Sequence, residues 1–196
     1  AGHNRIRGTV IRARGDLLPK QRVALFVAAG DGSRFKRLFR ETWKRIPLGS
    51  RRALCKLWRN IPPEWSLAHR VEVVLDAPCN VNATRHPDGW AYARCHRDLP
   101  SIHGRVFSFS GPHLDEMPDE EARVLIAHEL CHAWLRAEGR SFPGDEAGGR
   151  EHAEVSSRLH EWGFDEGALQ AWADSSGEAI WRRYKTESAD EPDPAR

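Results

Sequence analysis

The second half of the chain contains two histidines four residues apart with a glutamate directly after the first: His128-Glu129-Leu130-Cys131-His132. On an α-helix, residues four apart lie on one face, so both imidazoles can converge on one tetrahedral metal ion. The Glu129 side chain lies about a quarter of a turn away, where it can reach a water molecule at an open metal position. The spacing predicts a metal site with His128 and His132 as ligands and Glu129 as catalytic base.

A catalytic metal of this type needs a third protein ligand. Three candidates follow the motif: Glu151, His152 and Glu154. Glu151 and Glu154 are three residues apart and share a helix face, whereas His152 is expected to point elsewhere. A set of two histidines and one carboxylate also suits Fe(II), but the motif itself favours Zn²⁺. From the residues alone, the third ligand stays open.

Local signals predict the elements that position these side chains. Pro118 and three acidic residues begin an almost wholly apolar stretch that runs to Glu138 and ends at Gly139. This pattern predicts a central, buried helix that carries the motif. A glycine-rich loop, Gly144–Gly149, leads to a second helix over about 150–162, which carries the candidate third ligands.

Strand signals precede the motif helix. Valine and leucine alternate over 71–75, and Gly89–Arg94 and Arg105–Ser110 are further candidates, so we expect a small sheet. After the ligand-bearing helix, Asp165 can cap a last helix that includes Leu169. Strands and helices in this order predict an α+β domain.

The first 63 residues differ in character. Residues 33–46 place aromatic and aliphatic side chains at helical spacing, with arginine and lysine between them. Pro47 and Gly49 break this helix, and Ser50 can cap another. The sequence predicts a basic helical segment over 1–63, whose aromatic stripe packs in the core rather than against nucleic-acid bases.

Composition is that of a globular protein: 40% of the 196 residues are hydrophobic and 30% are charged. The net charge is +2, but residues 1–70 hold 17 Lys and Arg against 4 Asp and Glu, while residues 71–196 hold 13 against 24. Two surfaces of one molecule that attract each other explain this asymmetry best. A basic arm for nucleic acid is the alternative.

We expect a cytoplasmic protein without a membrane anchor. The longest apolar run, Val23–Ala29, is far shorter than the roughly 20 residues that span a bilayer, and no leader pattern is present. Four cysteines without a Cys-x-x-Cys pair do not suggest a disulfide framework. Cys131, inside the motif, is expected to be a small apolar filler of a buried helix rather than a ligand.

The stretch Leu125–Trp134, with a glutamate-bearing helix downstream, resembles the gluzincin clan of zinc peptidases. Glu154-Val155-Ser156, followed by Trp162-Gly163-Phe164, is similar to the ligand helix of minimal bacterial members. The resemblance implies a zinc-dependent peptidase acting on peptide or protein substrates, with Glu154 as third ligand. It also implies a zincin-like domain over 64–184, in which the strand at 105–110 is an edge strand that can pair with an extended peptide. Residues 185–196 then form a disordered tail.

The His-Glu-x-Cys-His pattern also resembles the SprT-like, DNA-associated proteases, which take their third ligand from a later histidine. That resemblance implies His152 as third ligand and a nucleic-acid partner for the basic N-terminal segment. A non-catalytic zinc-binding module is a further alternative. By residue type, His113, His160 and Tyr92 could stabilise an oxyanion.

Overall fold

The computed structural model describes residues 9–12, 24–27, 33–59, 70–76, 93–95, 106–145, 149–180 and 182–183. The strands are β1 (Thr9–Arg12), β2 (Ala24–Val27), β3 (Arg70–Asp76), β4 (Ala93–Cys95) and β5 (Val106–Ser110). The helices are α1 (Ser33–Arg45), α2 (Leu48–Arg59), α3 (Gly111–Glu116), α4 (Asp119–Ala137), α5 (Gly149–Glu161) and α6 (Glu166–Trp172), followed by a π-helical turn, η2 (Ala173–Gly177).

The strands form one mixed sheet in the order β1-β2-β3-β5-β4. β2, β3 and β5 run parallel, and β1 and β4 are antiparallel to their neighbours. The expectation that the strand at 105–110 lies at an edge is wrong, because β5 pairs with β3 on one side and with β4 on the other. The short strand β4 ends the sheet order on this side.

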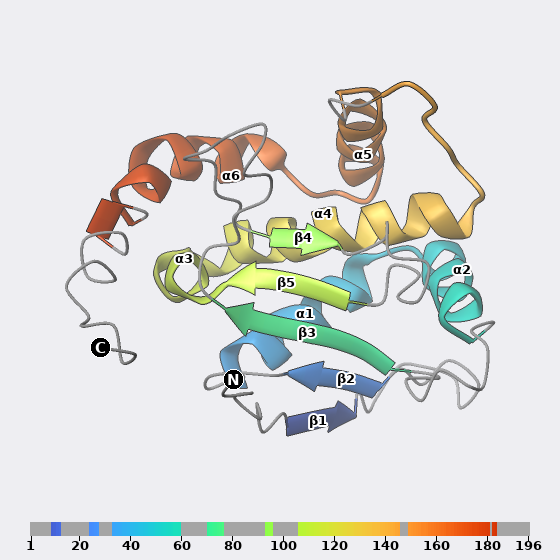
Figure 1. The fold of residues 1–196 in the computed structure, drawn as a ribbon, viewed down its shortest axis with the longest axis horizontal. Coiled ribbons are helices and arrows are strands. Elements are labelled where there is room, and N and C mark those ends of the chain that lie inside the picture. The colour runs from blue at the N-terminus through green and yellow to red at the C-terminus, as the bar shows by residue number, and fades with distance from the viewer. Residues whose placement is uncertain are drawn as a thin grey trace, which may run out of the picture.

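The helices α1 and α4 lie behind the sheet in Figure 1, and α5 and α6 lie above α4. The helix α4 is therefore central, since it contacts α1, α2, α5 and α6 as well as β4. Most of its residues from Ala122 to Leu135 are buried, as the apolar sequence predicted. Helices and a sheet occur together, which agrees with the predicted class at this coarse level.

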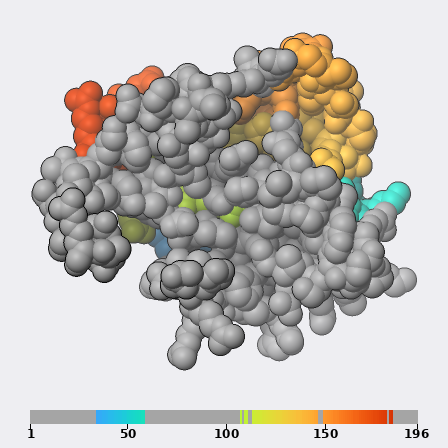
Figure 2. Space-filling view, in the orientation of Figure 1, coloured from blue at the N-terminus to red at the C-terminus, as the bar shows by residue number. Residues whose placement is uncertain are grey.

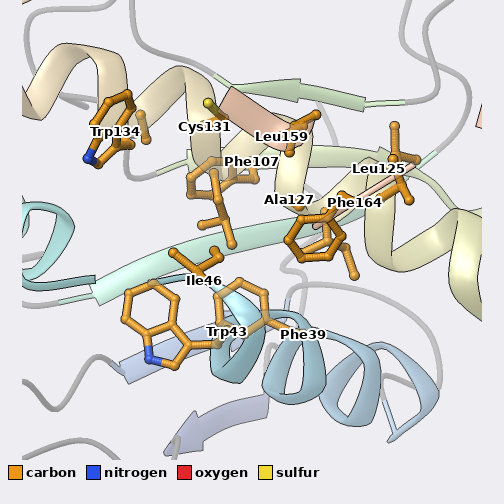
Figure 3. Packing of buried hydrophobic residues seen from close by; sticks show 14 of the residues in the cluster. Phe39, Trp43, Ile46, Phe107, Leu125, Ala127, Cys131, Trp134, Leu159 and Phe164 are labelled. Carbon is orange, nitrogen blue, oxygen red and sulfur yellow. The ribbon is translucent and has the colours of Figure 1, made fainter. Parts of the chain in front are cut away.

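One hydrophobic core joins α1, α2, α4, α5 and the sheet. Figure 3 shows Phe39 and Trp43 of α1 on the same side of α4 as Phe164. The aromatic stripe of α1 is buried, with Phe39 and Trp43 stacked at a ring separation of 6.2 Å. The prediction that this stripe belongs to the core is confirmed, and α1 is integral to the fold.

Arginines of α1 contact the acidic first turn of α4. Asp119 accepts hydrogen bonds from Arg34 at 2.9 Å and from Arg37 at 2.6 Å. These arginines hold the pKa of Asp119 below its ordinary value, with the bond from Arg37 the largest cause. Arg45 pairs with Glu120 in the same way. Part of the basic charge of the first 70 residues therefore meets acidic charge within the chain.

The structure corrects two expectations for residues 1–63. This segment contributes β1 and β2 to the sheet as well as two helices. Ser50 lies inside α2, which already begins at Leu48, so Ser50 is not its cap. The tail 185–196, expected to be disordered, lies outside the described residues. In the part of the chain that is described, no helix has the length and apolar character needed to cross a membrane.

Candidate metal centre

The motif residues lie near the middle of α4, which forms for local reasons. Asp119, Glu120 and Glu121 occupy its first turn, where negative charge offsets the helix dipole. Gly139 follows its end with a φ of 69°, a left-handed conformation that favours glycine. His128 and His132 therefore lie one turn apart on one face, with their Nε2 atoms 3.2 Å apart.

His152 of α5 completes a group of three imidazoles. Its ring centroid lies 5.3 Å from that of His128 and 4.9 Å from that of His132. One nitrogen from each ring lies within 4.8 Å of the others, so the three histidines are close enough to bind one metal ion. The exposure of His152 leaves one side of the group accessible, because α5 forms part of an exposed shoulder of the molecule (Figure 2).

Carboxylates from two different helices hold the outer nitrogens of the motif histidines. The Nδ1 atom of His132 lies 2.6 Å from Oε1 of Glu151, at the start of α5. The Nδ1 atom of His128 lies 2.9 Å from Oε1 of Glu166, at the start of α6. A carboxylate on the outer nitrogen of a metal-binding histidine fixes the tautomer and strengthens the ligand.

These hydrogen bonds determine which ring nitrogens carry protons. An ionised carboxylate can only accept, so Nδ1 is the protonated nitrogen in both His128 and His132. In a neutral ring, Nε2 would then carry the lone pair, and the Nε2 atoms of the two rings lie 3.2 Å apart. Two nitrogens bound to a tetrahedral zinc ion at about 2.0–2.1 Å are about 3.3 Å apart. The arrangement fits a cation between the rings.

The electrostatics of the site also favour a cation. Burial alone would lower the pKa of His128, but its bond to Glu166 and the charges of Glu129 and Glu166 outweigh burial and raise it. Burial likewise would raise the pKa of Glu166, yet hydrogen bonds from His128 and Ser156 hold it below its ordinary value. Negative charge therefore surrounds the imidazoles from more than one helix.

Two further motif residues are buried. Glu129 is only 5% exposed, next to the first histidine on the same helix. Cys131 is fully buried, and burial raises the pKa of its thiol to about 12. A thiol that stays protonated is a poor metal ligand, which agrees with the expectation that Cys131 is a filler.

The residue favoured as third ligand, Glu154, is not in this group. Its Oε1 atom lies 3.3 Å from Arg140 and 3.9 Å from Arg158. His152 points into the group instead, contrary to the expectation that it would point away. The rotation of α5 about its own axis explains this orientation. Val155 and Leu159 face the core, and His152 lies three and seven residues before them, so it is on the same face of the helix.

The three residues considered for oxyanion stabilisation have different positions. His113 is fully buried, with Nδ1 2.6 Å from Ser110 Oγ and Nε2 3.0 Å from the Gly177 carbonyl oxygen. Burial lowers its pKa, and its contacts tie α3 to η2. His160 is exposed on α5, and Tyr92 lies outside the described residues.

Glu166 was not among the site residues predicted from the sequence, and Glu151 was predicted only as a possible ligand. Nothing near Glu166 in the sequence indicates a contact with His128, which is 38 residues away. The chain matches no known family model, no curated protein and no solved structure. The interpretation of the site therefore depends on its own geometry.

Proposed function

We propose that the chain is a zinc-dependent peptidase whose metal is bound by His128, His132 and His152. One observation carries this proposal: three imidazoles converge, and a buried carboxylate, Glu129, adjoins one of them. Three histidines and an open fourth position form a known catalytic zinc site. His152 takes the place in which the sequence favoured Glu154.

Each residue has a defined role in the proposed reaction. A bound zinc ion would polarise the scissile carbonyl and acidify a water molecule. Glu129 would act as the general base that takes a proton from water and passes it to the leaving amine. Glu151 and Glu166 hold the Nδ1 protons of the two motif histidines, which keeps both Nε2 lone pairs directed inward.

The sheet offers a place for an extended substrate. Among the strands that the structure describes, β4 is last in the sheet order, and it contacts α4, the helix that carries the motif. An extended peptide can add to such an edge through main-chain hydrogen bonds. We therefore assign the substrate role of the zincin-like edge strand to β4 rather than to β5.

Metal content and peptide hydrolysis, measured together, test the proposal. We expect one zinc per wild-type chain and cleavage of a mixed peptide library. Glu129→Gln should retain zinc and lose about 10²–10⁴-fold in rate, the usual contribution of a general base. Glu121→Gln, a change in the first turn of the same helix, is the matched control.

Two outcomes would overturn the proposal. Full activity of Glu129→Gln would show that Glu129 is not the catalytic base. A wild-type chain that holds zinc but cleaves no peptide would support a non-catalytic zinc-binding module instead.

A DNA-associated protease is the second candidate, and the position of His152 favours it. A third histidine is the ligand that the resemblance to SprT-like proteases implies. Arg40, Arg52 and Lys56 are exposed on α1 and α2 and have no ion-pair partner among the described residues. Salt-dependent DNA binding that weakens when these three become alanine, but not in Arg182→Ala, would support this candidate.

We also propose a cytoplasmic setting. The side chains of Cys55 and Cys131 are both buried, and buried thiols agree with a reducing compartment.

A further inference from the structure

A pocket of about 490 Å³ adjoins the metal centre between α5 and α6. Its lining residues come from the second half of α5, the turn after it and the start of α6: Ser156, His160, Gly163, Phe164, Asp165 and Glu166. Its volume is within the range of about 300–1,000 Å³ that is usual for ligand sites. Of these residues, only Glu166 has a role in the proposed peptidase reaction.

The pocket is acidic. Asp165 and Glu166 line it, and no lysine or arginine is among its lining residues in the described part of the chain. Asp165 uses one oxygen, Oδ1, to accept the Gly167 amide at 2.9 Å. Its other oxygen, Oδ2, has no hydrogen-bond partner among the residues that the structure describes, and the side chain is exposed. A carboxylate oxygen is therefore available to a ligand.

Two arginines next to residues of this pocket, Arg45 and Arg158, are already engaged. Arg45 donates to the Gly163 carbonyl oxygen at 2.8 Å, pairs with Glu120, and lies over the Phe164 ring at 4.1 Å. Arg158 lies over the Trp134 ring and pairs with acids of its own helix. These partners offset both charges, so neither arginine neutralises the carboxylate of Asp165.

The pocket and the metal centre share one wall. Glu166 lines the pocket and also holds the Nδ1 atom of His128 at 2.9 Å. His152, Ser156 and His160 follow one another at intervals of four on α5, so they form a row that leads from the metal centre into the pocket. Each interval is about 6 Å along the helix, roughly the length of two residues of extended peptide.

We propose that this pocket binds a lysine or arginine side chain of the substrate, a few residues from the scissile bond. This inference rests on the proposed peptidase activity and adds to it a preference for basic substrates. The available oxygen of Asp165 accepts from the cationic group, and a volume of about 490 Å³ has room for a long side chain. Glu166 contributes charge and stays bound to His128.

Binding to zinc-loaded Glu129→Gln protein tests the preference separately from cleavage. The probes are blocked hexapeptides of alanine with one arginine at each position in turn, and the same peptides with uncharged citrulline. At one or two positions, the arginine peptide should bind about tenfold more tightly by calorimetry, a difference of about 1.4 kcal/mol. In the wild-type protein, kcat/KM should be higher for the arginine peptide than for the citrulline peptide by the same factor.

Asp165→Asn removes the charge but keeps the helix cap, because asparagine caps as well as aspartate. It should bring the ratio of arginine to citrulline binding close to one. Asp115→Asn, at an exposed aspartate of α3, is the matched control and should leave the ratio unchanged.

Equal binding of both peptides at every position would overturn the inference, as would an unchanged ratio in Asp165→Asn. Preference for an unblocked alanine peptide over the blocked arginine peptide would also overturn it, in favour of a site for the α-ammonium group. Arginine-selective binding without any cleavage would refute the peptidase proposal and leave the pocket assignment intact.

Discussion

The helix α4 carries two polar clusters that differ in burial and in the origin of their partners. At its first turn, Asp119 and Glu120 pair with arginines of α1 near the surface, and their side chains are 38% and 49% exposed. At its centre, His128 and His132 pair with carboxylates of α6 and α5, and their side chains are 17% and 9% exposed. Both clusters connect α4 to its neighbours.

The difference in burial predicts how each cluster responds to substitution. Exposed ion pairs contribute little to stability, because water and salt screen them. Polar groups in a buried site are costly to desolvate, so a cluster of histidines and acids there requires a compensating role. We expect changes at the first turn of α4 to affect folding slightly and changes at its centre to affect metal binding strongly.

The largest expected effect is the loss of zinc in His152→Ala. Removing one of three ligands should lower zinc affinity by more than the roughly 100-fold that an outer hydrogen-bond partner contributes. Glu154→Ala removes only an ion pair with Arg140 and Arg158, so it should bind zinc like the wild-type chain. Elemental analysis with a competing chelator measures zinc binding by both variants. If only Glu154→Ala loses zinc, the third ligand is Glu154 and not His152.

Next in size is the destabilisation caused by Leu38→Ala in the core beneath α1. Leu38 is 1% exposed, and such a truncation costs about 2–5 kcal/mol in free energy of unfolding. Arg40→Ala, at an exposed position of the same helix, should change stability by less than about 0.5 kcal/mol. Denaturant titration compares the two variants, and similar values would mean that α1 is not part of the core.

A smaller effect is expected when the carboxylate behind His128 loses its charge. Glu166→Gln should weaken zinc binding by about 10- to 100-fold, because the histidine becomes a weaker ligand. Glu178→Gln changes an exposed acid that pairs with Arg182, and should leave zinc affinity unchanged. Chelator competition measures both affinities; if Glu166→Gln binds zinc normally, α6 has no part in the metal site.

The smallest effect belongs to the surface cluster. Glu41 accepts from Arg123 at 2.9 Å, and the Glu41 side chain is 39% exposed. Glu41→Gln should lower the free energy of unfolding by less than about 1 kcal/mol, and high salt should reduce the difference further. Denaturant titration at two salt concentrations measures this difference. A loss of more than about 1 kcal/mol that persists at high salt would mean that the ion pair is shielded from solvent.

Local sequence signals predicted elements whose ends depend on nearby residues. The ends of α4 follow from its acidic first turn and Gly139, and the α6 cap follows from Asp165, whose Oδ1 accepts the Gly167 amide. The strands β1 and β2 were missed, because their pairing depends on distant partners: Phe26 of β2 lies opposite Glu72 of β3. Periodicity within a short segment cannot report such pairing.

Part of the candidate site followed from the sequence. The spacing of His128 and His132 placed both on one face of α4, and the close approach of their Nε2 atoms agrees with this. The orientation of His152 depended on how α5 packs, which Val155 and Leu159 could have indicated. The contact between Glu166 and His128 could not be predicted, because it arises only when α6 packs beside α4.

The contribution of Glu166 also bears on protein synthesis. A ribosome produces the motif helix first, then α5 with His152 and Glu151, and last α6 with Glu166. Until α6 has emerged and packed, His128 lacks the carboxylate that holds its outer nitrogen. The ribosome therefore produces the motif before the full set of carboxylate partners, so we expect a partly made chain to bind metal more weakly than the complete one.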